Sequence, residues 1–171
     1  MISIDERPPK VADRSVPGHW EGDLLMGKNH ALCTQQYRGA NNSHGDSCPV
    51  KSERCTRKAF ARELKSLPQH MKLSLTYDRG KEMAQHELFT KDTTMKVYFC
   101  HPNSPWERCT NENTSILIRD FSPEGTDFSK LSCKEIKHVQ LLLNERPRKS
   151  LNWKTPNVAF NLLLNSVALK T

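Results

Sequence analysis

The sequence has no long hydrophobic run. None of its 171 residues lie in an apolar stretch approaching the roughly 18 residues of a membrane-spanning helix, and the mean hydropathy is −0.71. The first fourteen residues, MISIDERPPKVADR, also lack the apolar centre of a secretory signal. These absences exclude an integral membrane protein. We therefore expect a cytoplasmic protein that does not bind membranes and whose 6 Cys are thiols rather than disulfides.

Apolar residues in general are scarce. Hydrophobic residues make up 36% of the chain and aromatic residues 7%, which predicts a thin hydrophobic core. The length leaves room for one compact domain. We expect residues 1–15, where prolines bracket charged residues, to form an extended arm and residues 16–171 to form the core.

Acidic residues are fewer than basic residues. The chain has 26 Lys and Arg against 19 Asp and Glu, a net charge of +7, and a pI near 9.2. This balance favours a polyanionic partner such as nucleic acid. The alternative is an ordinary solvated surface, because the basic residues are scattered, with modest clusters at 51–62 and 146–149.

Hydrophobic periodicity predicts alternating strands and helices in the first two thirds of the chain. The predicted elements are a strand at 19–27, a helix at 52–67 that ends before a proline, a half-buried strand at 73–77, a turn at 78–80, a short helix at 81–89 and a strand at 95–99. Residues 32–51 offer only Leu32, Tyr37 and Val50 as large apolar side chains and show no period, so this block is predicted to be irregular.

Three helices are predicted near the carboxyl end. The first spans 110–121, with Thr110 or Asn111 as N-cap and with Leu117 and Phe121 facing inward. The second spans 132–144 and turns Ile136, Leu143 and either Val139 or Gln140 to one face. The third opens at Thr155 and Pro156 and runs to about residue 169. The alternation predicts an α/β fold with a mixed sheet.

Three acidic residues stand at the ends of predicted elements. Asp23 lies in the first strand, Asp78 follows another strand, and Glu112 lies in the first turn of a helix. Catalytic groups of α/β sheets gather at the carboxyl ends of strands. Taken singly, each has a structural interpretation: a strand-edge residue, a turn former and a first-turn acid, respectively.

Other candidate residues carry less information. Arg119 shares a helix face with Glu112, which would place a guanidinium two turns from the carboxylate. Cys100, His101 and Cys109 lie close in sequence but lack the spacing of a zinc site, and no pair of the 7 His has metal-ligand spacing.

Several sequence motifs together resemble one family. GHWEGD, TYDRGKEM, VYFCHPNSPWERCTNENT, GTDFSK and LNERPRKSLNWKTP are similar, in this order, to the transposases of the IS30 family of bacterial insertion sequences. The resemblance runs from about residue 2 to residue 160, except for 32–52. It implies a ribonuclease-H-like, integrase-type catalytic core at 16–171, with Asp23, Asp78 and Glu112 as a catalytic and metal-binding DDE triad.

The resemblance also implies a reaction and its partners. We expect phosphoryl transfer on DNA with Mg²⁺ or Mn²⁺, as two ions: water cleaves at the element end, and the freed 3′ hydroxyl then joins target DNA. The partners are the insertion-sequence ends and target DNA, a homo-oligomer on DNA is an open alternative, and the expected location is the nucleoid. Residues beside the triad motifs are candidate DNA contacts, namely Lys81, Arg108, Asn111 and Arg119.

The chain departs from the family at several places. Family members have two strands after the first catalytic strand, so the unmatched block at 32–52 predicts that the second and third strands are lost or irregular. A reading-frame slip and its correction is one hypothesis for this block. The family's N-terminal helix-turn-helix region has no counterpart in the sequence. Single-residue departures are Cys109, Ser115, Ser122, Glu124 and Val158.

These departures leave two rivals to an active transposase. One is a degenerate, inactive remnant that binds DNA nonspecifically through its net charge. The other is a related ribonuclease-H-like nuclease that cleaves DNA without joining ends.

Overall fold

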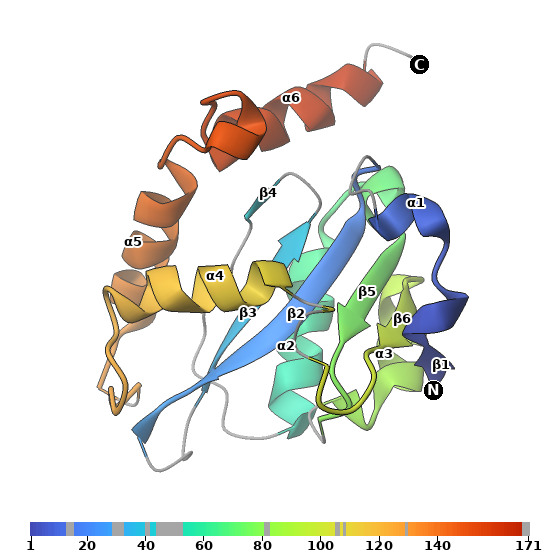
Figure 1. Cartoon of the computed structure of the whole chain (residues 1–171), viewed down its shortest axis with the longest axis horizontal. Coiled ribbons are helices and arrows are strands. Elements are labelled where there is room, and N and C mark those ends of the chain that lie inside the picture. Colours follow the sequence, from blue (N-terminus) through green and yellow to red (C-terminus); the bar gives the residue numbers. More distant parts are fainter. Residues whose placement is uncertain are drawn as a thin grey trace.

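A computed structural model describes residues 1–12, 16–28, 33–39, 42–43, 53–80, 83–104, 107, 109–128 and 130–168 (Figure 1). These residues form one mixed sheet in the strand order β1-β6-β5-β2-β3-β4. The strands are β1 (Ile2–Ser3), β2 (His19–Met26), β3 (Cys33–Gly39), β4 (Asn42–Ser43), β5 (Ser74–Tyr77) and β6 (Lys96–Phe99). The α-helices are α1 (Pro9–Ala12), α2 (Glu53–Lys65), α3 (His86–Thr93), α4 (Cys109–Arg119), α5 (Cys133–Asn144) and α6 (Pro156–Ala168).

The sheet has a parallel part and an antiparallel part. β1, β6, β5 and β2 run parallel to one another, whereas β3 is antiparallel to both β2 and β4. Helices flank the sheet, and Figure 1 shows α4 crossing in front of β2 and β3 while α2 lies behind them. The predicted α/β fold with a mixed sheet is confirmed.

The prediction of an irregular block at 32–52 is wrong for the described part of that block. β3 pairs with β2 over its full length, from Trp20↔Gly39 to Met26↔Cys33, and β4 pairs with β3. Antiparallel pairing is held by backbone hydrogen bonds, which residues without an apolar period can also form. The second and third strands are therefore present, and the rest of the block, at 32, 40–41 and 44–52, lies outside the described residues.

The hydrophobic core fills the space between α2 and the sheet. Its largest fully buried side chains are Trp20, Phe60, Leu64, Leu75, Tyr77, Met83, Phe89, Met95 and Phe99. The rings of Phe60 and Tyr77 meet edge to face with centroids 5.7 Å apart. A Cβ on Gly22 would lie 2.7 Å from the Tyr77 ring, so this packing requires glycine in β2.

β5 is buried on both faces rather than half-buried as predicted. Its central position between β2 and β6 covers all four of its residues. The two polar ones keep hydrogen bonds: Ser74 Oγ lies 2.7 Å from His19 Nδ1, and Thr76 Oγ1 accepts from Arg7 Nη1 at 3.3 Å. Burial of a hydroxyl is tolerated where such a partner exists.

The helices at the carboxyl end match the prediction in part. α5 begins after the N-cap Ser132 with a capping box to Glu135, and Ile136 and Leu143 are buried on one face as predicted. Thr155 Oγ1 accepts from the backbone N–H of Val158, which confirms it at the start of α6. By contrast, Phe121 lies beyond the end of α4 and is 46% exposed, so its predicted inward position is wrong.

Two helices begin at other residues than predicted. α4 begins at Cys109, so Thr110 and Asn111 lie within the helix and neither caps it. α3 begins at His86 instead of residue 81, and residues 81–82 lie outside the description. The turn at 78–80 is confirmed, since Asp78 Oδ1 accepts from the Gly80 N–H at 3.1 Å.

The amino-terminal segment joins the sheet. β1 pairs in parallel with β6, and the 3₁₀ helix η1 (Ile4–Glu6) and α1 follow it. The described part of the segment predicted as an extended arm therefore adds an edge strand and two short helices. In the residues that the structure describes, no helix is both long and apolar enough to cross a membrane.

Candidate functional site

The register of β2 against β5 brings two of the candidate acids level with each other. The paired residues are His19↔Ser74, Trp20↔Leu75 and Glu21↔Thr76. Two residues further along both strands, the same register places Asp23 beside Asp78, which directly follows β5. Neighbouring strands lie about 4.8 Å apart, so these residues are neighbours at the carboxyl end of β5.

Both acids belong to the sheet face that α4 crosses. Trp20 in β2 and Tyr77 in β5 belong to the core beneath α2, and Gly22 faces Tyr77. Because side chains alternate between the two faces, Asp23 falls on the opposite face, and continuing β5 by one residue puts Asp78 there too. α4 contacts β2 and β3 from that side (Figure 1).

Backbone N–H groups fix part of each carboxylate. The N–H of Leu24 donates to Asp23 Oδ1 at 2.9 Å, and the N–H of Gly80 donates to Asp78 Oδ1. Both aspartates are half-buried. Each carboxyl group is thus oriented by the backbone without being sealed into the core.

Glu112 lies in the first turn of α4, as predicted. Its side chain lies outside the described part of the chain, and so does that of Asn111. Among the described residues no three His, Cys, Asp or Glu side chains form a group that could hold a metal ion. Extending the β2–β5 register thus sets Asp23 level with Asp78, and the helix that carries Glu112 contacts β2 and β3.

The remaining candidate DNA contacts divide into two groups. Lys81 and Arg108 lie outside the described residues. Arg119 is described: its Nη1 donates to the carbonyl oxygens of Ser122 and Pro123 at 3.4 and 3.3 Å. These bonds fasten the turn that follows α4, so Arg119 stabilises the end of the helix on which Glu112 lies.

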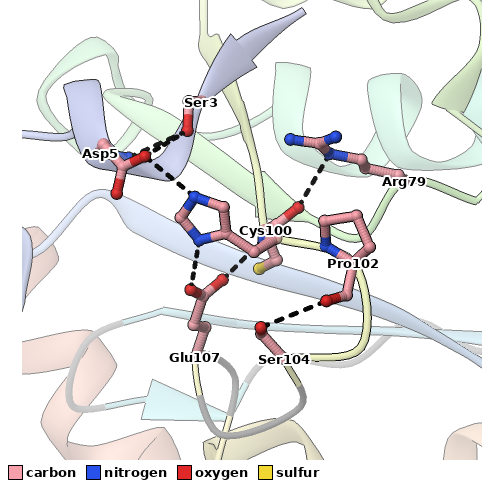
Figure 2. Close-up of polar contacts among 8 residues, drawn as sticks. Ser3, Asp5, Arg79, Cys100, Pro102, Ser104 and Glu107 are labelled. Carbon is pink, nitrogen blue, oxygen red and sulfur yellow. Dashed lines mark hydrogen bonds and ion pairs between the residues drawn. The ribbon is translucent and has the colours of Figure 1, made fainter.

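A histidine held between two carboxylates closes the loop from β6 to α4, as Figure 2 shows. His101 Nδ1 lies 2.7 Å from Glu107 Oε1, and His101 Nε2 lies 2.9 Å from Asp5 Oδ2 in η1. The His101 N–H also donates to Glu107 Oε2 at 2.9 Å. Sequence reasoning missed this cluster, although the six-residue spacing of His101 and Glu107 is compatible with a closed loop.

The cluster favours its charged forms. The hydrogen bond that His101 donates to Glu107, followed by the charge of Asp5, raises the pKa of His101. Burial opposes ionisation of Glu107, yet its hydrogen bonds from His101 outweigh burial and lower its pKa. The pKa of Asp5 is lowered by the Ser3 hydroxyl, with His101 adding to the effect. His101 therefore links the amino-terminal segment to the loop, and its protonated form strengthens this link.

A second link ties the same loop to the strand beside Asp78. The Cys100 N–H donates to the Tyr77 carbonyl at 3.0 Å, and Arg79 Nε donates to the Cys100 carbonyl at 3.2 Å (Figure 2). The Cys100 side chain itself is buried. The turn after β5 and the loop that leads to α4 are thus joined next to Asp78.

The chain is similar to curated transposases over most of its length. It is 42% identical over 158 residues to the transposase of insertion sequence IS1086 from Cupriavidus metallidurans, covering 91% of this chain and 47% of that protein. It is 42% identical over 154 residues to the InsI transposase of IS30A from Escherichia coli, covering 90% of this chain and 40% of that protein.

A third relative agrees. The transposase of IS4351 from Bacteroides fragilis is 38% identical over 172 residues, covering 96% of this chain and 51% of that protein. No protein-family model matches the chain. The chain spans about half the length, or less, of these relatives. All three relatives are named transposases of insertion sequences, one of them of IS30A, and the chain is similar to each of them over at least 90% of its own length.

Proposed function

We propose that residues 16–171 form the ribonuclease-H-like catalytic core of a DDE transposase that cleaves and joins DNA. The observation that carries this proposal is the β2–β5 register, which sets Asp23 beside Asp78 on the face that α4 crosses. The two antiparallel strands that follow β2 add support, because the family resemblance implies them.

The donor set suits a divalent cation. Asp23, Asp78 and Glu112 would hold the metal, since carboxylate oxygens are the hard ligands that Mg²⁺ and Mn²⁺ prefer. A bound pair of such ions supplies positive charge to the attacking and leaving oxygens of an in-line phosphoryl transfer. Because both aspartates are only half-buried, their carboxylates remain accessible to a large substrate.

The chain's own residues would orient the reacting groups. The N–H groups of Leu24 and Gly80 fix the two aspartates, and the links through Arg79 and His101 hold the loop that leads to α4. Groups that are already oriented before the substrate binds lower the activation barrier of the reaction. In this proposal Arg119 positions the turn after α4 and also reaches DNA, while Lys81, Arg108 and Asn111 contact phosphates.

DNA is the proposed partner, as insertion-sequence ends and as target. The net charge of +7 supports a polyanion. Assembly of several copies on DNA belongs to the same proposal, because joining two element ends to one target requires more than one active site close together.

A plasmid nicking assay tests the proposal. With Mg²⁺ present, the chain should convert supercoiled plasmid to the nicked form, and Asp78→Asn should remove this activity. Pre-cut ends added to a target plasmid should then yield joined products. Equal nicking by the chain and the variant would overturn the proposal and leave a remnant that only binds DNA. Nicking without joining would indicate a nuclease.

A further inference from the structure

The connection between α5 and α6 gathers cations around an exposed tryptophan. We call residues 146–154 the basic loop; its charged members are Arg146, Arg148, Lys149 and Lys154. Trp153, between them in the same loop, is 71% exposed. Within the described ranges none of these cations takes part in an ion pair. Folding therefore collects like charges here, and no ion pair among the described residues offsets them.

The surroundings of Arg148 disfavour its charged form. Arg148 is half-buried, and burial together with the charge of Arg146 lowers its pKa. The nearby Glu145 carboxylate instead accepts from the side chain of Asn157. An anionic ligand would relieve the repulsion between these cations.

Hydrogen bonds within the loop hold the backbone of Trp153. The Trp153 N–H donates to the Arg148 carbonyl at 3.0 Å, and the Arg148 N–H donates to the Lys154 carbonyl at 3.1 Å. Asn152 and Trp153 have φ of 52° and 63°, a left-handed conformation that bulky residues rarely adopt. An exposed indole on a backbone held in this way can offer its face to a flat partner, and its exposure is not explained by packing within the described residues.

We propose that the basic loop is a binding site for single-stranded DNA, with a base stacked on Trp153 and phosphates held by Arg146, Arg148 and Lys149. Fixed aromatic faces next to cations are the means by which proteins bind unpaired strands without reading sequence. A phosphate-only contact would use the cations but would give the indole no role. The inference rests on the proposed function only in taking DNA as the partner; strand cleavage exposes such unpaired ends.

Fluorescence anisotropy tests this site. It measures the binding of the chain, in the presence of EDTA, to a fluorescently labelled thymidine oligonucleotide of about 12 nucleotides. Trp153→Ala should weaken binding about tenfold or more, and Trp153→Phe, which keeps a ring, should stay within about threefold of the parent chain. Lys91→Ala on α3, another exposed cation, is the matched control and should change affinity little. Thermal melting should be the same for all, because Trp153 is exposed.

The salt dependence provides the second arm. Lys149→Ala should reduce the slope of log affinity against log salt by about 0.7, the value for one phosphate contact on a single strand. Undiminished binding by Trp153→Ala, or tighter binding of a duplex of equal length, would overturn the inference. Because EDTA prevents metal-dependent cleavage, the two assays are independent. If the parent chain binds the oligonucleotide but does not nick plasmid, only the proposed function is contradicted. If the parent chain nicks plasmid and Trp153→Ala binds the oligonucleotide as tightly as the parent does, only this inference is contradicted.

Discussion

The imidazole of His101 and the carboxylate of Glu107 meet at 2.7 Å across the loop between β6 and α4. Asp5 approaches the other ring nitrogen from η1, so one side chain joins the sheet edge to the loop that leads to Glu112. This link makes the stability of the loop depend on the charge of His101.

The pKa shifts define the pH window of that link. The pKa of His101 is raised above 6.5, so its contribution is complete below that value and is lost as pH rises through the raised pKa. The pKa values of Asp5 and Glu107 are lowered, so their contributions are lost as pH falls through those lowered values. The link is therefore strongest between the ordinary pKa of Glu107, 4.5, and that of His101, 6.5.

Replacing His101 with Gln should remove this pH dependence. We expect the difference in free energy of unfolding between the parent chain and His101→Gln to be largest near pH 6 and to shrink towards pH 8.5. Urea denaturation at several pH values measures it. Asp5→Asn is the control that removes the negative charge on the η1 side but keeps an oxygen acceptor, and it should show a smaller effect. A difference that stays constant across this range would contradict the link.

Gly22→Ala should destabilise the fold. The new Cβ would lie 2.7 Å from the Tyr77 ring and 3.2 Å from Phe60, and overpacking of this kind costs about 1–3 kcal/mol. Thermal or urea denaturation measures the loss. In a Tyr77→Leu background the additional cost of Gly22→Ala should be smaller, because the ring that obstructs the methyl group is gone. Equal costs in the two backgrounds would show that Tyr77 is not the obstacle.

Ser132→Ala should shorten or loosen α5. The hydroxyl accepts from the Glu135 N–H, and loss of such an N-cap costs about 1 kcal/mol. Glu135→Gln keeps an oxygen that can accept from the Ser132 N–H, so it should cost less. Denaturation of the two variants checks the order, and the reverse order would argue against the capping box.

Much of the fold could be predicted from local patterns. Phe60 and Leu64 in α2, and Ile136 and Leu143 in α5, repeat at helical spacing because each helix turns one side to the core. β3 escaped prediction because its pairing with β2 depends on backbone hydrogen bonds, which leave no apolar period in the sequence. The inward position assigned to Phe121 failed because α4 ends at Arg119.

The candidate site could likewise be predicted only in part from the sequence. Asp23 and Asp78 could be placed near each other because carboxyl ends of parallel strands meet at one edge of a sheet. The cluster around His101 could not, because Asp5 lies 96 residues away in sequence and nothing local signals the contact. The register between β2 and β5 is likewise a property of the folded sheet, and it is what sets the two aspartates level.

Binding of Mn²⁺, counted by the loss of the free-ion electron paramagnetic resonance signal, tests most directly whether Asp23 and Asp78 share a metal site. The account predicts that the parent chain binds Mn²⁺ and that Asp23→Asn and Asp78→Asn each weaken binding at least about tenfold, since each removes a charged ligand. Asp120→Asn, at an exposed residue just after α4, is the control and should bind as the parent does. Equal Mn²⁺ binding by the parent and both site variants, all folded by circular dichroism, would contradict the account.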